Sequence, residues 1–128
     1  MNKGQRLYKF ILGLLMPFLF LACSSKERIK IDGGTFNVDG KDVQLICGEM
    51  HYARIPHEYW RDRLKRARAM GLNTISVYVF WNFHERQPGE FDFSGQADVA
   101  EFVRLAQEEG LYVILRPGPY ACAEWDFG

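Results

Sequence analysis

The sequence predicts an α/β fold built on a parallel sheet, and two observations carry this prediction. Apolar runs and amphipathic segments alternate between residues 43 and 115 in the order strand, helix, strand, helix, strand. Successive strands begin about 30 to 40 residues apart, which is the spacing of repeated βαβ units. The strands are apolar almost throughout, as is typical of strands covered on both faces. Periodicity alone does not separate a closed barrel from an open, doubly wound sheet.

The first 22 residues are expected to lie outside any core. Three basic residues precede a short apolar run over residues 10–22, which is the pattern of a secretory signal peptide. The run is shorter than the roughly 20 residues that a membrane span needs. LFLAC followed by SSKER resembles the lipobox of bacterial lipoproteins, with Phe20 where that motif usually has Leu, Val or Ile. We therefore expect lipidation at Cys23.

Lipidation would make the mature protein an exported lipoprotein, anchored to a membrane in the periplasm or at the outer membrane of a bacterium. Ordinary signal cleavage nearby and an uncleaved N-terminal anchor are the alternatives.

Residues 23–35 are polar and glycine-containing, and they are expected to form a tether that leads into a first strand. Alternating residues on either side of Asp39-Gly40 then predict a β-hairpin.

The first predicted strand of the parallel sheet covers residues 43–48, and a helix is expected over residues 57–71. Gly71 is placed to end this helix in the left-handed conformation. The spacing of four apolar residues puts them on one helix face: Trp60, Leu64, Ala67 and Met70.

The next strand is expected over residues 73–81, rich in β-branched and aromatic residues, and a loop follows it. Asp98 and Glu101 have the spacing of a capping box at the start of a second helix, which Gly110 ends. Residues 111–115 form the third strand. The expected apolar stripe of the second helix comprises Val99, Phe102, Val103 and Ala106.

Composition and the absence of certain motifs argue against several classes of function. The chain has 128 residues, of which 48% are hydrophobic, and a formal net charge of zero. That composition suits a globular domain and gives no general reason to expect a nucleic-acid partner. The basic residues between Arg61 and Arg68 fit the solvated face of an amphipathic helix. No Gly-rich phosphate loop follows the first strand, no metal-ligand spacing stands out, and no cofactor is expected.

Polar and aromatic residues follow all three strands. GEMHY follows the first, YVFWNFHE spans the end of the second, and RPGPYACAEW follows the third. The carboxyl ends of parallel strands lie on one side of a sheet, where α/β proteins build their sites. Carboxylates can bind sugar hydroxyls, and aromatic rings can pack on the apolar face of a sugar. These loops therefore indicate a sugar-binding site, although each residue alone could equally serve packing.

These strings closely resemble the start of the catalytic domain of β-galactosidases of glycoside hydrolase family 35, from about Gly48 to Gly128. The resemblance implies that residues 36–128 are the N-terminal part of a (β/α)₈ TIM barrel, with about three of its βα units. It also implies retaining hydrolysis of terminal β-linked galactose from glycans, without a cofactor.

The resemblance also assigns roles to residues. Tyr78 matches a tyrosine that contacts galactose, and Glu124 matches a residue that binds hydroxyl groups without being a catalyst. Cys122 and Ala123 belong to the segment that lines the same subsite. Tyr52 and Trp125 match aromatic residues of the rim.

No catalytic residue is expected among residues 1–128. A retaining glycosidase needs two carboxyl groups about 5–5.5 Å apart. Glu85 and Glu124 look like such a pair, but the family places its acid/base and nucleophile after later strands, beyond Gly128. The chain is therefore expected to be an inactive N-terminal piece of a longer enzyme. A non-catalytic sugar-binding lipoprotein and a barrel glycosidase for another β-linked sugar are the alternatives.

Overall fold

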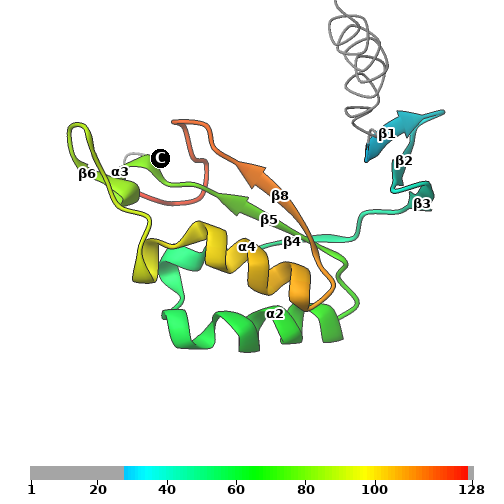
Figure 1. The fold of residues 1–128 in the computed structure, drawn as a ribbon, viewed down its shortest axis with the longest axis horizontal. Helices are drawn as coiled ribbons and strands as arrows, with labels where there is room; N and C mark the ends of the chain where they lie inside the picture. The colour runs from blue at the N-terminus through cyan, green and yellow to red at the C-terminus, as the bar shows by residue number, and fades with distance from the viewer. Residues whose placement is uncertain (1–27, 127–128) are drawn as a thin grey trace, which may run out of the picture. The chain divides into compact units, whose positions relative to one another are not determined.

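The computed structural model describes residues 28–126, which fall into two compact units divided after Val43. In the first unit, β1 (Ile29–Asp32), β2 (Thr35–Val38) and β3 (Lys41–Val43) form an antiparallel sheet (Figure 1). The second unit holds every other helix and strand of the described residues. The signal peptide and Cys23 fall outside the described residues.

The hairpin predicted around Asp39-Gly40 is confirmed. Asp39 has φ 51° and Gly40 has φ 84°, the left-handed conformations that a tight two-residue hairpin requires. The structure adds a strand that the sequence interpretation did not contain, because the tether expected over residues 23–35 includes β1. Gly33-Gly34 links β1 to β2, and both glycines have positive φ.

The second unit is built on the predicted parallel sheet, with the order β4-β5-β8. Its strands are β4 (Cys47–Glu49), β5 (Thr74–Tyr78) and β8 (Tyr112–Arg116). The strand expected over residues 43–48 is displaced toward the C-terminus, because Val43 pairs with Phe36 in the first unit's sheet instead. The other two strands agree with the prediction apart from their boundaries.

The helices α2 (Trp60–Ala69) and α4 (Val99–Glu108) lie on the same side of this sheet (Figure 1). Trp60, Leu64 and Phe102 are fully buried between the helices and the sheet. Burying a side chain of this size stabilises a fold by about 1.5–3 kcal/mol. The remaining core residues of this cluster are Tyr52, Ala67, Ile75, Val77, Leu105, Ala106 and Leu111.

The start of α4 and the C-terminal ends of both helices follow their sequence signals, whereas α2 begins at Trp60 because residues His57–Tyr59 form a separate 3-10 turn. The Asp98 side chain accepts a hydrogen bond of 2.8 Å from the backbone N–H of Glu101, as an N-cap should. Gly71 and Gly110 follow the helices with φ 93° and 75°, which is the left-handed C-cap conformation. Met70 does not join the predicted apolar face: it is 79% exposed, because α2 ends at Ala69.

Three basic residues of α2, Arg61, Arg63 and Arg66, have acidic partners. Arg61 binds Glu108 and Glu109, which lie at the end of α4, and Arg66 binds Asp62 one turn earlier in α2. These ion pairs lie at the surface and contribute little individually. They show that part of the basic face of α2 is matched by acids within the described residues.

The segment expected as a loop after β5 contains short regular elements. α3 (Trp81–His84) is followed by the hairpin of β6 (Glu85–Gln87) and β7 (Glu90–Phe91). Gly89 turns this hairpin with φ 81°. Elements of two to four residues are too short for hydrophobic periodicity to detect.

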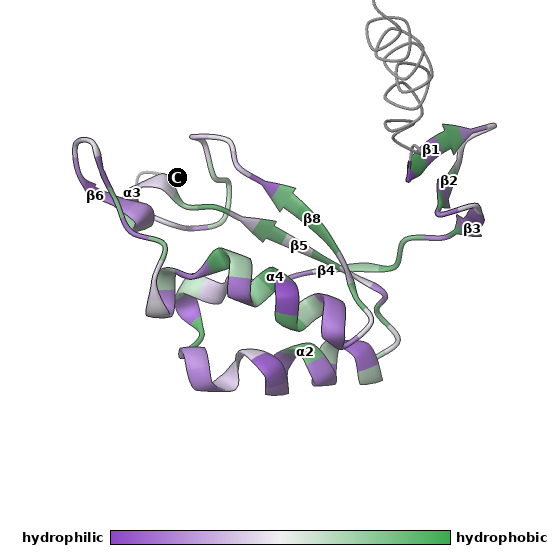
Figure 2. Cartoon of the chain, viewed as in Figure 1, coloured by the Kyte–Doolittle hydropathy of each residue, from purple (hydrophilic) through white to green (hydrophobic). Residues whose placement is uncertain are grey.

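The apolar strands are not covered on both faces within the described residues. Figure 2 shows apolar colouring along β5 and β8, yet only β5 is largely buried, and Ile114 and Leu115 of β8 are 41% and 46% exposed. β4 and β8 are also the two edges of the sheet. No helix within residues 28–126 has the length and hydropathy needed to cross a bilayer.

These exposed edges make the isolated segment prone to self-association. We expect residues 23–128, produced alone, to aggregate, and Ile114→Lys to raise the soluble fraction because a charge on an edge strand opposes pairing. Size-exclusion chromatography with light scattering measures both effects. Gln107→Lys, which adds the same charge on α4, is the matched control. A soluble monomer with a cooperative thermal transition would contradict the expectation.

Candidate functional site

The carboxyl ends of the parallel strands bring Glu49, Tyr78 and Arg116 together. Tyr78 pairs with Arg116 in the register of β5 and β8, and Glu49 ends the neighbouring strand β4. A carboxylate oxygen of Glu49 lies 3.9 Å from Nη1 of Arg116. The prediction that the strand ends place these side chains at one rim is confirmed.

Tyr78 is buried, with 4% of its surface exposed, and three side chains pack against its ring. The guanidinium carbon of Arg116 lies 3.9 Å from the ring centroid, within the range of a cation–π interaction. The ring of His51 stacks at a centroid distance of 6.0 Å and an angle of 26°, and Phe80 also lies 6.0 Å away. The ring therefore has a defined orientation.

His51 sits between the strand-end carboxylate and the core. Its Nε2 lies 3.2 Å from a Glu49 oxygen, while its buried Nδ1 has no hydrogen-bond partner among the described residues. Burial lowers the pKa of His51; Glu49 opposes this shift, and the cations Arg54 and Arg116 add to it.

The turn after β8 is tied to the loop after β4 by Arg54. Nη2 of Arg54 donates hydrogen bonds to the backbone oxygens of Ala123 and Glu124, at 2.8 and 2.6 Å. Glu124 has φ 51°, an uncommon conformation for a non-glycine residue that the surrounding structure must hold. Its carboxylate-bearing side chain is exposed. No sequence pattern indicated this role of Arg54.

Trp125 joins the same region from the other side of this turn. Its ring stacks on Phe80 at 4.2 Å and 20°, and Arg54 lies 5.3 Å from the ring centroid. The indole N–H donates to the side-chain oxygen of Asn82 at 2.8 Å. Trp125 is therefore half-buried and fixed by three neighbours, and Ala121 packs beside Tyr78 and Phe80.

The structure places Tyr52 in the core, not on the exposed rim where the sequence interpretation put it. Tyr52 is fully buried, and its hydroxyl lies 2.5 Å from Nε2 of His84. Nδ1 of His84 donates to the carbonyl of Asp92, which leaves Nε2 to accept from the tyrosine. Burial raises the pKa of Tyr52, so its hydroxyl stays protonated. Trp60 packs edge-on against its ring.

Glu85 has a structural role in the β6–β7 hairpin. One of its carboxylate oxygens accepts a hydrogen bond of 2.8 Å from the backbone N–H of Gly89. Cys47 and Cys122 are free thiols, and both are exposed. Within residues 28–126, no cluster of three or more His, Cys, Asp or Glu side chains could hold a metal ion.

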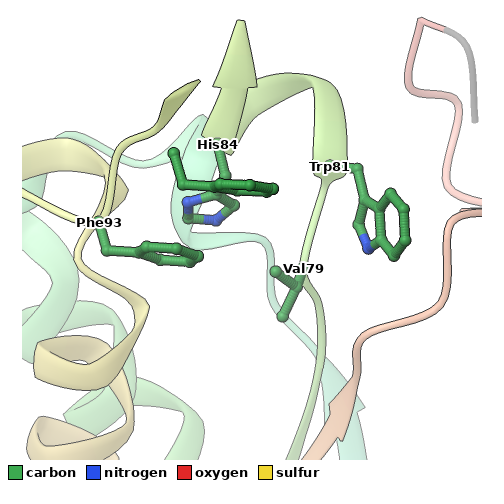
Figure 3. Close-up of a pocket in the computed structure, with 5 residues that line it drawn as sticks. Val79, Trp81, His84 and Phe93 are labelled. Carbon is green, nitrogen blue, oxygen red and sulfur yellow. The ribbon is translucent and has the colours of Figure 1, made fainter. Parts of the chain in front are cut away.

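A separate apolar pocket of about 220 Å³ lies beside α3 (Figure 3). The Trp81 ring is 51% exposed, and its N–H donates to the carbonyl of Pro117. Since both nitrogens of His84 are already hydrogen-bonded, this pocket offers a ligand few polar groups. It is lined by Val79, Trp81, His84, Phe91 and Phe93.

Comparison with known proteins decides the family. The model of glycosyl hydrolases family 35 matches residues 35–128. The chain belongs to this family. It is 54% identical over 117 residues to a beta-galactosidase of Xanthomonas manihotis and 53% identical to one of Felis catus. These matches cover 91% and 90% of the chain but only 20% and 18% of the two relatives, so the chain spans about a fifth of their length.

Solved structures agree with the fold of this family member. A beta-galactosidase from the psychrophilic Marinomonas ef1 matches with a TM-score of 0.50 and 25% identity, over 56% of this chain and 11% of the other. An endogalactoceramidase matches with a TM-score of 0.54 and 23% identity, over 67% and 21%. The parallel βα units of the chain thus correspond to part of the TIM-barrel glycosidase fold.

Arg54 bonds two backbone oxygens of residues 121–126, and we predict that these bonds limit local opening of this turn. Arg54→Met removes two charge-assisted hydrogen bonds, so we expect backbone amides in this turn to exchange about tenfold faster. Hydrogen–deuterium exchange with mass spectrometry of the full-length protein measures this. The control is Arg63→Met, which removes an arginine of α2 that lies over the ring of Tyr59. Unchanged exchange at 121–126 would contradict the role.

The lowered pKa of His51 predicts a pH dependence of stability. The unfolded chain, with a histidine pKa of about 6.5, binds this proton more readily than the folded chain does. Stability should therefore fall as pH decreases through about 6.5, and His51→Gln should weaken that dependence. Melting temperatures of the full-length protein between pH 7.5 and 5 measure it, with His57→Gln as control. Equal slopes for wild type and His51→Gln would contradict it.

Proposed function

We propose that this chain is the N-terminal part of a retaining exo-β-galactosidase that releases terminal β-linked galactose from glycans. The observation that carries the proposal is the packing of Tyr78 in one cluster with Phe80 and Ala121, which draws the turn after β8 to the end of β5. Membership of family 35 and the names of the relatives support the reaction.

Galactose recognition is assigned to this cluster. Tyr78 supplies an aromatic ring and a hydroxyl, and Glu124 supplies an exposed carboxylate for sugar hydroxyls. Cys122 and Ala123 line the same subsite, and the half-buried ring of Trp125 borders it. A sugar with several hydroxyls and one apolar face suits such a combination. Because Arg54 holds the backbone at Ala123 and Glu124, the main chain that carries this carboxylate is fixed before the sugar arrives.

The catalytic carboxyl pair is proposed to lie beyond residue 128. Retention of configuration needs an acid/base and a nucleophile about 5–5.5 Å apart. Glu49 is engaged with His51 and Arg116, and Glu85 holds the β6–β7 turn. A full barrel takes about 250 residues, and the curated relatives are several times longer than this chain. The barrel would close, and the pair would assemble, in the longer protein.

We also propose that the protein is exported and anchored to a bacterial membrane through lipidated Cys23. The support is the basic start, the short apolar run and the lipobox-like LFLAC. An anchored exo-glycosidase would meet glycans outside the cytoplasm. This proposal is independent of the assignment of the sugar site.

The decisive experiment assays the full-length protein with a chromogenic β-galactoside. We expect turnover with retention of anomeric configuration by proton NMR, and no turnover from residues 1–128 alone. Glu124→Gln should lower kcat/KM about a hundredfold, because two hydrogen bonds to a charged group are weakened. Glu85→Gln, at the carboxylate that holds the hairpin, is the control and should change kcat/KM little.

Three outcomes would contradict the proposal. Galactose binding without hydrolysis would indicate a sugar-binding lipoprotein. A preference for another β-linked sugar would indicate a different barrel glycosidase. Activity of residues 1–128 alone would show that the catalytic carboxylates lie within this chain.

A further inference from the structure

Tyr78 forms one cluster at the strand ends with three other side chains: Glu49, His51 and Arg116. The two carboxylate oxygens of Glu49 face different partners: one lies 3.2 Å from Nε2 of His51, and the other lies 3.9 Å from Nη1 of Arg116. His51 and Arg116 in turn both lie against the ring of Tyr78, at 6.0 Å and 3.9 Å. Glu49 therefore links the two groups that contact the ring.

Fold stability does not explain this arrangement well. The side chains of Glu49 and Arg116 are 41% and 44% exposed, and an exposed ion pair at 3.9 Å contributes little to stability. The hydrophobic contacts of Tyr78 with Phe80 and Ala121 do not require a charge. What the cluster does supply is a cation held over an aromatic face, which attracts the ring electrostatically and restricts its tilt.

We propose that Arg116 is a positioning residue that fixes the ring of Tyr78 for sugar binding. Glu49 holds the guanidinium of Arg116, and His51 packs against the ring. The inference rests on the proposed function, in which Tyr78 contacts galactose. It deepens that function, because it assigns a role at the same site to three side chains that need not touch the sugar. Arg116 acts only through Tyr78.

A double-mutant cycle in the full-length protein tests this dependence. Arg116→Met should lower kcat/KM for a chromogenic β-galactoside about tenfold and raise the inhibition constant of free galactose by a similar factor. Arg116→Lys, which keeps a cation, should stay within about threefold of wild type. In a Tyr78→Leu background, Arg116→Met should change kcat/KM by less than about twofold.

The matched control is Arg63→Met, which removes a guanidinium that lies 5.8 Å from the ring centroid of Tyr59, away from the strand ends. It should leave kcat/KM unchanged. Melting temperatures accompany every variant, and a structural role alone would lower them for Arg116→Met and Arg116→Lys alike without coupling to Tyr78. Equal effects of Arg116→Met in the wild-type and Tyr78→Leu backgrounds would overturn the proposal.

A crystal structure of the full-length Arg116→Met variant separates this inference from the proposed function. We expect the Tyr78 ring to be displaced or to adopt a second rotamer, whether or not the protein hydrolyses galactosides. An unmoved Tyr78 ring would overturn the positioning role even if wild type is an active galactosidase. Conversely, absence of galactoside turnover by wild type with a displaced ring in the variant would contradict the proposed function alone.

Discussion

The parallel pairing of β5 with β4 on one side and β8 on the other is the constraint on which the site depends. Parallel pairing puts the carboxyl ends of all three strands on the same side of the sheet. Each strand then continues into a polar or aromatic loop. Because β5 is buried along its length, its register with both neighbours is firmly specified. A shift of one residue would turn Tyr78 to the opposite face of the sheet.

Two arginines, Arg54 and Arg116, connect the loops that follow the carboxyl ends of the strands. Arg54 reaches from the loop after β4 to backbone oxygens of the turn after β8. Arg116, the last residue of β8, returns over the ring that ends β5. Each guanidinium contacts both polar and aromatic groups, which its planar, delocalised charge permits and a lysine would do less well. The three loops are thereby connected by side chains and not only by the sheet.

The core between the helices and the sheet is mainly apolar, unlike the carboxyl ends of the strands. Helices α2 and α4 bury aromatic and aliphatic residues against one face of the sheet, and the hydrogen-bonded pair of Tyr52 and His84 lies among them. A tyrosine and a histidine next to rim residues in the sequence thus serve packing, since each satisfies the other's buried polar atom. Neighbouring positions in one loop, His51 and Tyr52, face different environments for this reason.

The sequence by itself determined the order of the βα units, the Asp39-Gly40 hairpin, the Asp98 cap and the glycines that end both helices, because each depends on local backbone conformation or on periodicity. It also indicated which loops meet, since parallel strands leave no other arrangement. Tertiary structure alone decided that Tyr52 is buried and that Arg54 holds the turn at Glu124. These depend on contacts between residues about 30 to 70 positions apart, such as Tyr52 with His84 and Arg54 with Glu124, and no local pattern encodes them.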